Sequence, residues 1–516
     1  MENQNESRTK ATTKNMIWGI ISKMISLLLQ FISRTLFIYV LGKELLGVNS
    51  LYTEVLSMLS LAELGFGTAF TFALYKPIAE NNEEKIRQLI FLFKKIYYII
   101  ALIVLCIGFV LVPLLQFIVQ GADYVSLNEL RIYFVIFLSN TVINYFVQYK
   151  TTYVNARMKS YVVTNIEMIT NFVIIVTQCL IIYFFRNYLA YLLVNTGLLL
   201  LSKIVIALYL NMKFPILNEK PQEPLPKNEK KEIYTEVKGL ALQNFAGVAI
   251  HSTDNLIISM ASGLGVVGVG LVSNYNIIIT AVTAFIVILM TSLTPGFGNL
   301  VATSTQEHYK ETFNEVNFYN FWIYGFCSIA FFVLIPPFIT LWLGEDYLID
   351  IWPFLLIIIN IYMQGQCTIY NNARNAKGNF NLDKWISVIQ AIINLVVSII
   401  CAKVWGLLGV YIGTIVSRLF FVIARPIKTY RFLYGSSSLY YFRDFIIYFL
   451  VTIFAGVTTY YVTKNVFNNG VTIPNFILSC VIVTCIPNVI FFVVFVRTRY
   501  MKMLLKRIKR VVKRNG

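Results

Sequence analysis

The sequence predicts an all-α integral membrane protein of about 14 transmembrane helices, built as two pseudo-symmetric six-helix lobes plus two C-terminal helices. Three observations lead to this prediction: the composition, the length of the apolar blocks and an internal repeat. Of the 516 residues, 57% are hydrophobic and 13% are charged, whereas about a quarter of a soluble protein is charged. The apolar blocks reach roughly 20 residues, enough for a helix to cross a bilayer, and a helix satisfies its own backbone polar groups there.

Fourteen apolar spans can be placed along the chain, and the charges between them orient the protein. The spans cover residues 15–41, 48–75, 95–119, 130–150, 162–185, 188–211, 238–260, 264–295, 318–343, 347–372, 384–402, 404–424, 444–463 and 471–496. With a cytoplasmic N-terminus, the inner segments hold 34 of the 43 Lys and Arg residues and the outer loops hold 5. This bias predicts that both termini are cytoplasmic.

The same bias explains the net charge of +18, so we expect no nucleic-acid partner. The first apolar run is too long for a signal-peptide core, so no cleaved targeting peptide is expected. The basic tail at 497–516 has apolar residues at helical spacing, which favours either an amphipathic helix on an anionic membrane surface or a plain positively charged anchor. The seven cysteines lie in apolar spans without a CxxC pair, which predicts neither disulfides nor a metal site.

An internal repeat divides the chain into halves. The motif TTYVNAR at 151–157 returns as TIYNNAR at 368–374, 217 positions later. Pro113 in the first half matches Pro336 in the second, an offset of 223. The Gly-Val pair at 47–48, between two spans, matches the pair at 268–269, an offset of 221. Three matches in the same order predict two like-oriented six-helix halves that rock about a central site. The two prolines could act as hinges or as static kinks.

The predicted domains follow from this repeat and from a linker rich in Pro, Lys and Glu. They are an N-terminal six-helix lobe (1–211), a cytoplasmic linker (212–237), a C-terminal six-helix lobe (238–430), two additional helices (431–496) and a basic cytoplasmic tail (497–516). Sequences of this linker composition connect domains without adding a core of their own.

Several spans carry polar residues on one helical face, which predicts a wet cavity between the lobes because polar groups are costly in lipid. The candidates for binding substrate there are Lys23, Gln30, Arg34, Glu63, Asn140, Asn144, Gln243, Asn360 and Gln364. Lys203 and Arg418 lie nearer the inner surface, where long side chains often reach out to water, so they are weaker candidates.

One stretch, AIHSTDNLIISM at 249–260, places His251 and Asp254 on one face of an apolar span. The repeat brings Asp254 to nearly the same depth as Arg34. We therefore expect Asp254, with His251, to bind H⁺ or Na⁺ and to couple an ion gradient to transport. The alternatives are a buried Arg34–Asp254 pair that only fixes helix packing and a histidine that serves only in packing.

The chain resembles the polysaccharide repeat-unit flippases of the multidrug/oligosaccharidyl-lipid/polysaccharide (MOP) exporter superfamily. The resemblance rests on residues 34–87, TDNLIISMASGLGVVGVGLVSNYN (253–276), LWLGEDY (341–347) and GLLGVYIGTIVSRL (406–419), and extends over about 15–430. It implies two six-helix lobes around a central cavity, with two further helices. Related lipid II flippases hold the diphosphate with cavity cations, and Arg34 and Lys23 best match that role here.

The resemblance implies a transporter rather than an enzyme, located in the bacterial plasma membrane. Its substrate would be an undecaprenyl-diphosphate-linked oligosaccharide, moved outward by alternating access for capsule, O-antigen or exopolysaccharide synthesis. No cofactor beyond the coupling ion is expected, and membrane lipids and the glycan polymerase machinery are candidate partners. One alternative is a multidrug exporter of the same superfamily. The other is a membrane glycan polymerase or ligase, which the short outer loops disfavour.

Overall fold

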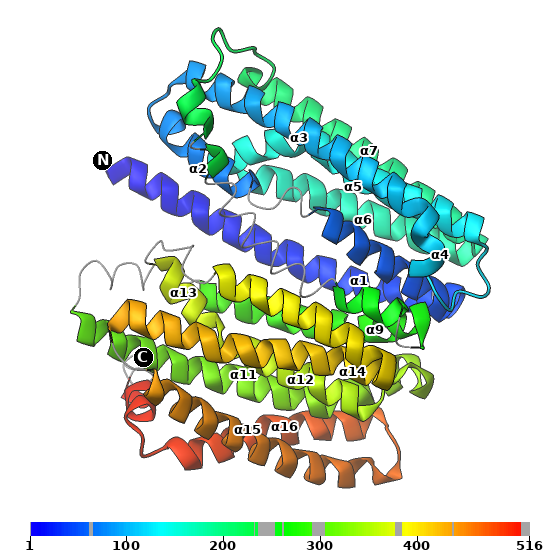
Figure 1. Ribbon diagram of the computed structural model, residues 1–516, viewed down its shortest axis with the longest axis vertical. Helices are drawn as coiled ribbons and strands as arrows, with labels where there is room; N and C mark the ends of the chain where they lie inside the picture. Colours follow the sequence, from blue (N-terminus) through cyan, green and yellow to red (C-terminus); the bar gives the residue numbers. More distant parts are fainter. Residues whose placement is uncertain are drawn as a thin grey trace. The chain divides into compact units, whose positions relative to one another are not determined.

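The computed structural model describes residues 2–60, 66–231, 233–235, 253–260, 263–291, 305–376, 384–435 and 438–506. These residues form helices and turns, with no strand among them (Figure 1). The chain folds as two compact units, Met1–Gly270 and Leu271–Gly516. The predicted all-α class is therefore confirmed.

The first unit is a helical bundle that ends in a short 3-10 turn. Its elements are α1 (Glu2–Leu59), α2 (Phe66–Ala79), α3 (Glu83–Leu111), η2 (Val112–Leu114), α4 (Leu115–Ile118), α5 (Leu127–Ala156), α6 (Ser160–Phe185), α7 (Tyr188–Lys213) and η3 (Pro215–Leu217). Helix α1 packs along α6, and α5 lies against both α3 and α7. Buried aromatic rings join these helices, as where Tyr52 meets Phe134 edge to face at 5.3 Å between ring centroids.

Local chemistry sets where these helices bend and end. Gly42 adopts φ 80°, which breaks α1 between two spans. Such a conformation is open to glycine because it lacks a Cβ. Pro113 lies in the 3-10 turn η2, which interrupts the third span. Ser126 and Glu129 form a capping box at the start of α5, satisfying backbone donors that have no partner within the helix.

The first unit also includes residues 253–270, which follow the linker in sequence. The Ser259 hydroxyl donates to the Ile118 carbonyl at 2.5 Å, and the Val266 amide donates to the Gln120 carbonyl at 2.7 Å. Gly47 lies so close to the Val266 carbonyl oxygen that a Cβ on it would stand 1.8 Å away. The segment is thus docked on α1 and α4 through contacts that only a glycine backbone allows.

The second unit contains the remaining helices. They are α9 (Gly265–Thr291), which begins in the first unit, α11 (Gln306–Leu343), η4 (Glu345–Tyr347), α12 (Ile351–Gln366), α13 (Thr368–Ala376), α14 (Lys384–Tyr434), α15 (Leu439–Val466), η5 (Phe467–Asn469) and α16 (Ile473–Phe495). Gly406, with φ 56°, splits α14 into two spans. These two spans pack on each other, since Asn394 Nδ2 donates to Thr414 Oγ1 at 3.2 Å.

The two additional C-terminal helices pack on α11. The Phe321 and Tyr448 rings stack with centroids 4.1 Å apart, and the Trp322 indole donates to Asn488 Oδ1 at 2.7 Å. The described part of the tail is helical, and Met501 is buried in the same aromatic cluster. Leu504 and Leu505 pack against this cluster and stay half-buried, so the membrane-surface role of the tail stays a prediction.

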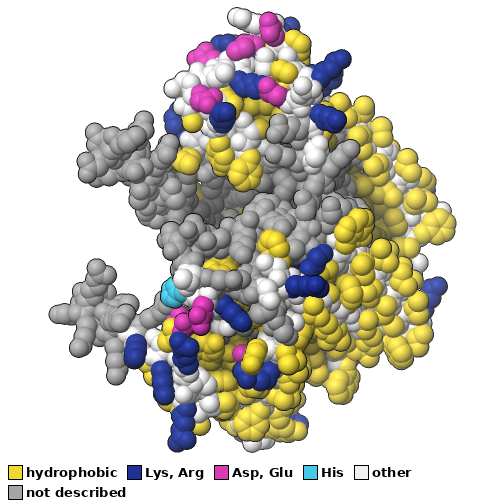
Figure 2. All heavy atoms as spheres, turned by 60° about the vertical axis from the view of Figure 1, so that its left-hand side comes forward, with side chains coloured by type: hydrophobic (Ala, Val, Ile, Leu, Met, Phe, Trp, Pro, Cys, Tyr) yellow, Lys and Arg dark blue, Asp and Glu magenta, His cyan; other side chains and the backbone are white. Residues whose placement is uncertain are grey.

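The described residues include eleven helices that are long and apolar enough to cross a membrane. Two of them are the glycine-broken helices α1 and α14, and most of the predicted span 238–260 lies outside the described residues. These findings are consistent with 14 spans and show a multi-pass membrane protein. Figure 2 shows charged side chains gathered at the helix ends and hydrophobic ones over the flanks.

Candidate functional site

A buried arginine and a predicted amide meet inside the second unit. Arg418, on the second half of α14, is 5% exposed, and its Nε donates to Asn360 Oδ1 of α12 at 2.9 Å. Inserting a helix with an arginine at the centre of the bilayer costs about 2.5–3.5 kcal/mol. Arginines at such positions therefore usually have a function. Arg418 was expected only as a weaker candidate, with its side chain reaching out to water. The structure instead places it in the interior with Asn360.

A second buried arginine, Arg425, lies on the same face of α14 and was not predicted. The Phe421 ring lies between the two guanidinium groups, with ring-to-carbon distances of 5.8 Å for Arg418 and 4.6 Å for Arg425. Stacking on a ring face supports a desolvated arginine. The signal was present in the sequence, because Arg, Phe and Arg at spacings of three and four share one helical face.

Helix α12 presents a second amide beside Asn360. Gln364 follows Asn360 by four residues, so both lie on one helical face, and its side chain is exposed. The third amide side chain of α12, that of Gln366, is buried. Asn320 of α11 donates to the Gly365 carbonyl at 3.0 Å. The accessible amides of α12 are therefore the two that the sequence predicted.

In the first unit, Arg34 is half-buried on α1 and lies close enough to Tyr191 of α7 for its charge to act on that ring. Ser33 and Gln178 are within hydrogen-bonding reach of the same tyrosine. Gln30, one turn before Arg34, is exposed. Arg34 thus lies among polar groups from α1, α6 and α7.

The two asparagines predicted on the fourth span lie together on α5. The Asn144 amide donates to the Asn140 carbonyl at 2.9 Å. The Asn140 side-chain oxygen is buried and has no hydrogen-bond partner among the described residues. A buried acceptor without a partner costs about 1–3 kcal/mol, so Asn140 keeps an unused hydrogen-bonding position inside the bundle.

Asp254 is half-buried in the helical residues 253–260 that dock on the first unit. Its neighbours Thr253 and Asn255 are buried. Glu63, Gln243 and His251 lie outside the described residues, and Lys23 is described only as part of the α1 backbone. Among the described residues no group of three His, Cys, Asp or Glu side chains is placed to hold a metal ion. The ion-coupling role of Asp254 and His251 stays a prediction.

The second unit also contains a groove of about 410 Å³ with an almost wholly apolar lining. It lies between α11, α12 and α15, so one of the two additional helices forms a wall. Its lining includes Phe332, Ile358, Tyr362, Ile453, Gly456 and Tyr460. A cleft of this kind accepts a hydrocarbon chain because apolar surface there is removed from water or headgroups.

Comparisons with known proteins agree with this architecture. Residues 12–301 match a family described as polysaccharide biosynthesis protein. A structure described as lipid II flippase MurJ in an inward closed conformation aligns with a TM-score of 0.64 at 13% identity, covering 93% of this chain and 99% of that one. An inward-facing multidrug resistance MATE family transporter of the MOP superfamily aligns with a TM-score of 0.61 at 14% identity, covering 82% and 98%.

A third solved structure gives the same fold. The Vibrio cholerae MATE transporter VcmN in its bent form aligns with a TM-score of 0.55 at 15% identity, covering 83% of this chain and 98% of that one. No curated protein matches the sequence. The structural matches establish the fold, and the family match covers more than half of the chain.

Proposed function

Because the chain belongs to the polysaccharide biosynthesis protein family of the MOP superfamily, whose members and structural neighbours are transporters and flippases rather than enzymes, we propose that it flips lipid-linked oligosaccharides. The substrate is an oligosaccharide repeat unit on undecaprenyl diphosphate, moved from the inner to the outer leaflet of the bacterial plasma membrane. An ion gradient drives alternating access, and both termini are cytoplasmic.

The observation that carries this proposal is the apolar groove beside α15. A substrate with a long polyprenyl chain needs an apolar path for the chain and a polar path for the headgroup. The groove can shelter a hydrocarbon chain, and one of the two additional helices, α15, supplies part of its wall.

The polar groups fit the remaining parts of the substrate. Arg34, Arg418 and Arg425 are cations held within the two units, and a guanidinium group can bind two phosphate oxygens at once. Asn360 and Gln364 offer the amide donors and acceptors that sugar hydroxyls use. The combination of cations, amides and an apolar groove favours a glycolipid diphosphate over a purely cationic drug.

The groove can be tested by filling it. Gly456 lines it, and a Cβ there would meet Ile329 at an ordinary 3.5 Å, so Gly456→Leu should fold while occupying the groove. We expect the variant to slow the flipping of an undecaprenyl-linked oligosaccharide about tenfold in proteoliposomes. The same oligosaccharide on a short polyprenyl chain should be affected little.

The matched control is Gly197→Leu on α7, where a Cβ meets nothing within 4 Å. It should leave flipping of both substrates unchanged. Equal rates for wild type and Gly456→Leu on the long-chain substrate would mean that the groove does not take the lipid chain.

A further inference from the structure

Two lysines converge where α3, α5 and α7 meet near their cytoplasmic-side ends. Lys150 of α5 is 6% exposed, and its Nζ donates to Asn211 Oδ1 of α7 at 2.6 Å. Lys94 of α3 lies close enough for the two positive charges to repel each other. An ammonium group has three donors, and the chain gives this buried one a neutral amide and, at 5.6 Å, the Tyr149 ring, but no carboxylate.

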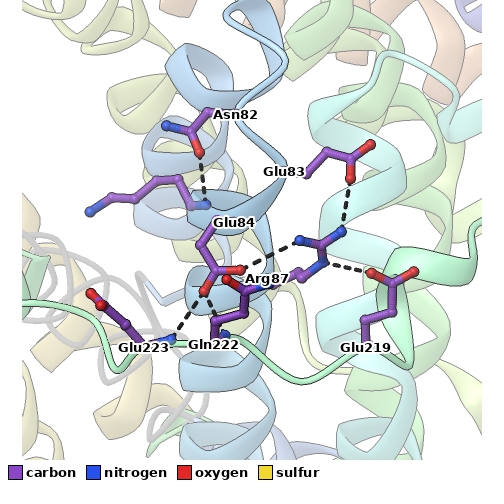
Figure 3. Close-up of polar contacts among 8 residues, drawn as sticks. Asn82, Glu83, Glu84, Arg87, Glu219, Gln222 and Glu223 are labelled. Carbon is purple, nitrogen blue, oxygen red and sulfur yellow. Dashed lines mark hydrogen bonds and ion pairs between the residues drawn. The ribbon is translucent and has the colours of Figure 1, made fainter.

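The chain supplies carboxylates nearby, but not to these lysines. Arg87, seven residues before Lys94 on α3, donates to Glu83 at 2.8 Å, to Glu84 at 3.4 Å and to Glu219 of the linker at 2.6 Å (Figure 3). Seven residues span about 10 Å along a helix. Among the described residues, no ion pair includes Lys94 or Lys150. Their charges are therefore left for a ligand from outside the chain.

The fold does not require a lysine at this place. The motif that begins at residue 151 returns 217 positions later, and the position matching Lys150 is Cys367. Cys367 is 2% exposed, so a small apolar residue fills the equivalent place in the second half. A buried charge is costly to keep without a purpose. Lys150 thus has a role specific to the first unit.

The surroundings identify the source of the anion. Lys94 Nζ lies 5.8 Å from the Tyr98 ring centroid, and Tyr98 packs edge to face on Phe146 at 5.5 Å. Both rings are on the outer flank of the bundle, Tyr98 at 41% and Phe146 at 48% exposure. In a membrane protein such a flank faces lipid, and basic pockets between helices on this side hold anionic headgroups.

We propose that Lys94, Lys150 and Asn211 form a binding site for the phosphate of an anionic phospholipid in the leaflet at which α3 begins. The phosphate bridges the two ammonium groups and relieves their repulsion. Tyr98 and Phe146 contact the first carbons of its chains. The site lies on the outer flank of the first unit and serves to hold a lipid, apart from the groove in the second unit.

The test measures phosphatidylglycerol retained by the full-length protein in native mass spectrometry, with phosphatidylcholine as the comparison lipid. Lys150→Met should weaken phosphatidylglycerol retention about tenfold, and Lys94→Met should weaken it to a similar extent. Asn211→Asp places a carboxylate within 2.6 Å of the ammonium group, which neutralises it internally. We expect Asn211→Asp to lose the lipid while keeping the wild-type thermal stability or raising it.

Lys95→Met is the matched control, because Lys95 is exposed on the adjacent face of α3. It should retain phosphatidylglycerol as the wild type does. Equal losses in Lys95→Met and Lys150→Met would show diffuse attraction to a basic surface and overturn the site. So would unchanged retention in Asn211→Asp and Lys94→Met. Displacement of phosphatidylglycerol by much lower concentrations of farnesyl diphosphate would assign the site to a diphosphate lipid and overturn the phospholipid proposal.

Discussion

At the scale of single residues, the polar groups in the membrane-spanning helices fall into those used for packing and those left accessible. Tyr52 is fully buried, and its hydroxyl donates to the Leu130 carbonyl at 2.9 Å, which fixes α1 to α5. Gln30 and Gln364 are exposed. Helical spacing alone put the two glutamines on polar faces. It could not tell which face meets a neighbouring helix, because that depends on contacts between residues far apart in sequence.

The Arg418–Asn360 pair gives a direct residue-level prediction. Replacing Arg418 with Gln removes charge-assisted hydrogen bonds worth about 1.5–3 kcal/mol to a phosphate, so the initial flipping rate should fall roughly 10- to 100-fold. Arg418→Lys keeps the charge without the planar fork and should give an intermediate rate. Both rates are measured in proteoliposomes with a labelled undecaprenyl-diphosphate oligosaccharide.

Arg443→Gln is the control for loss of one positive charge, because Arg443 is exposed and pairs with its neighbour Asp444 at 2.9 Å. It should flip at the wild-type rate. A monodisperse Arg418→Gln protein with wild-type flipping would limit Arg418 to helix packing.

Asp254 carries the prediction for ion coupling. Asp254→Asn keeps the size of the side chain but cannot release a proton or bind Na⁺ by charge. We expect the variant to lose the acceleration of flipping by an imposed H⁺ or Na⁺ gradient while keeping its melting temperature. An undiminished response to both gradients would rule Asp254 out as the coupling residue.

At the scale of the elements, the sequence predicted most spans closely because each is a continuous apolar block. Helix α6 begins at Ser160 and α7 at Tyr188, within two residues of the predicted starts. Helix α3 begins at Glu83, well before the predicted 95, because its first turns are charged and extend beyond the apolar core. Hydropathy marks the part of a helix in lipid, and not the full hydrogen-bonded helix.

The close approach of Gly47 to Val266 gives an element-level prediction. A Cβ at Gly47 would stand 1.8 Å from the Val266 carbonyl oxygen, so Gly47→Ala must separate residues 263–270 from α1. Overpacking of this kind costs about 1–3 kcal/mol, and the melting temperature should fall.

Gly197→Ala provides the comparison, since its Cβ would meet nothing within 4 Å. In a helix interior this change favours the folded state by up to about 1 kcal/mol, so its melting temperature should hold or rise. A Gly47→Ala protein as stable as Gly197→Ala would mean that the docked segment tolerates separation.

At the scale of the whole molecule, the repeat predicted two related halves, and the fold is that of the MOP superfamily. Sequence could not predict that residues 253–260 and 263–270 dock on the first unit, or that α15 completes a groove with α11 and α12. Both depend on packing between segments that are remote along the chain. Each unit holds cations and amides of its own, Arg34 in the first and Arg418 with Asn360 in the second.

The measurement that tests this account most directly is transport by the purified protein in proteoliposomes. A fluorescent undecaprenyl-diphosphate oligosaccharide is placed in one leaflet, and its crossing is followed by quenching from outside, with and without an ion gradient. We predict crossing that requires the protein and accelerates in the gradient. Absence of crossing for several glycans, together with export of cationic drugs by the same preparation, would contradict the account and indicate a multidrug exporter.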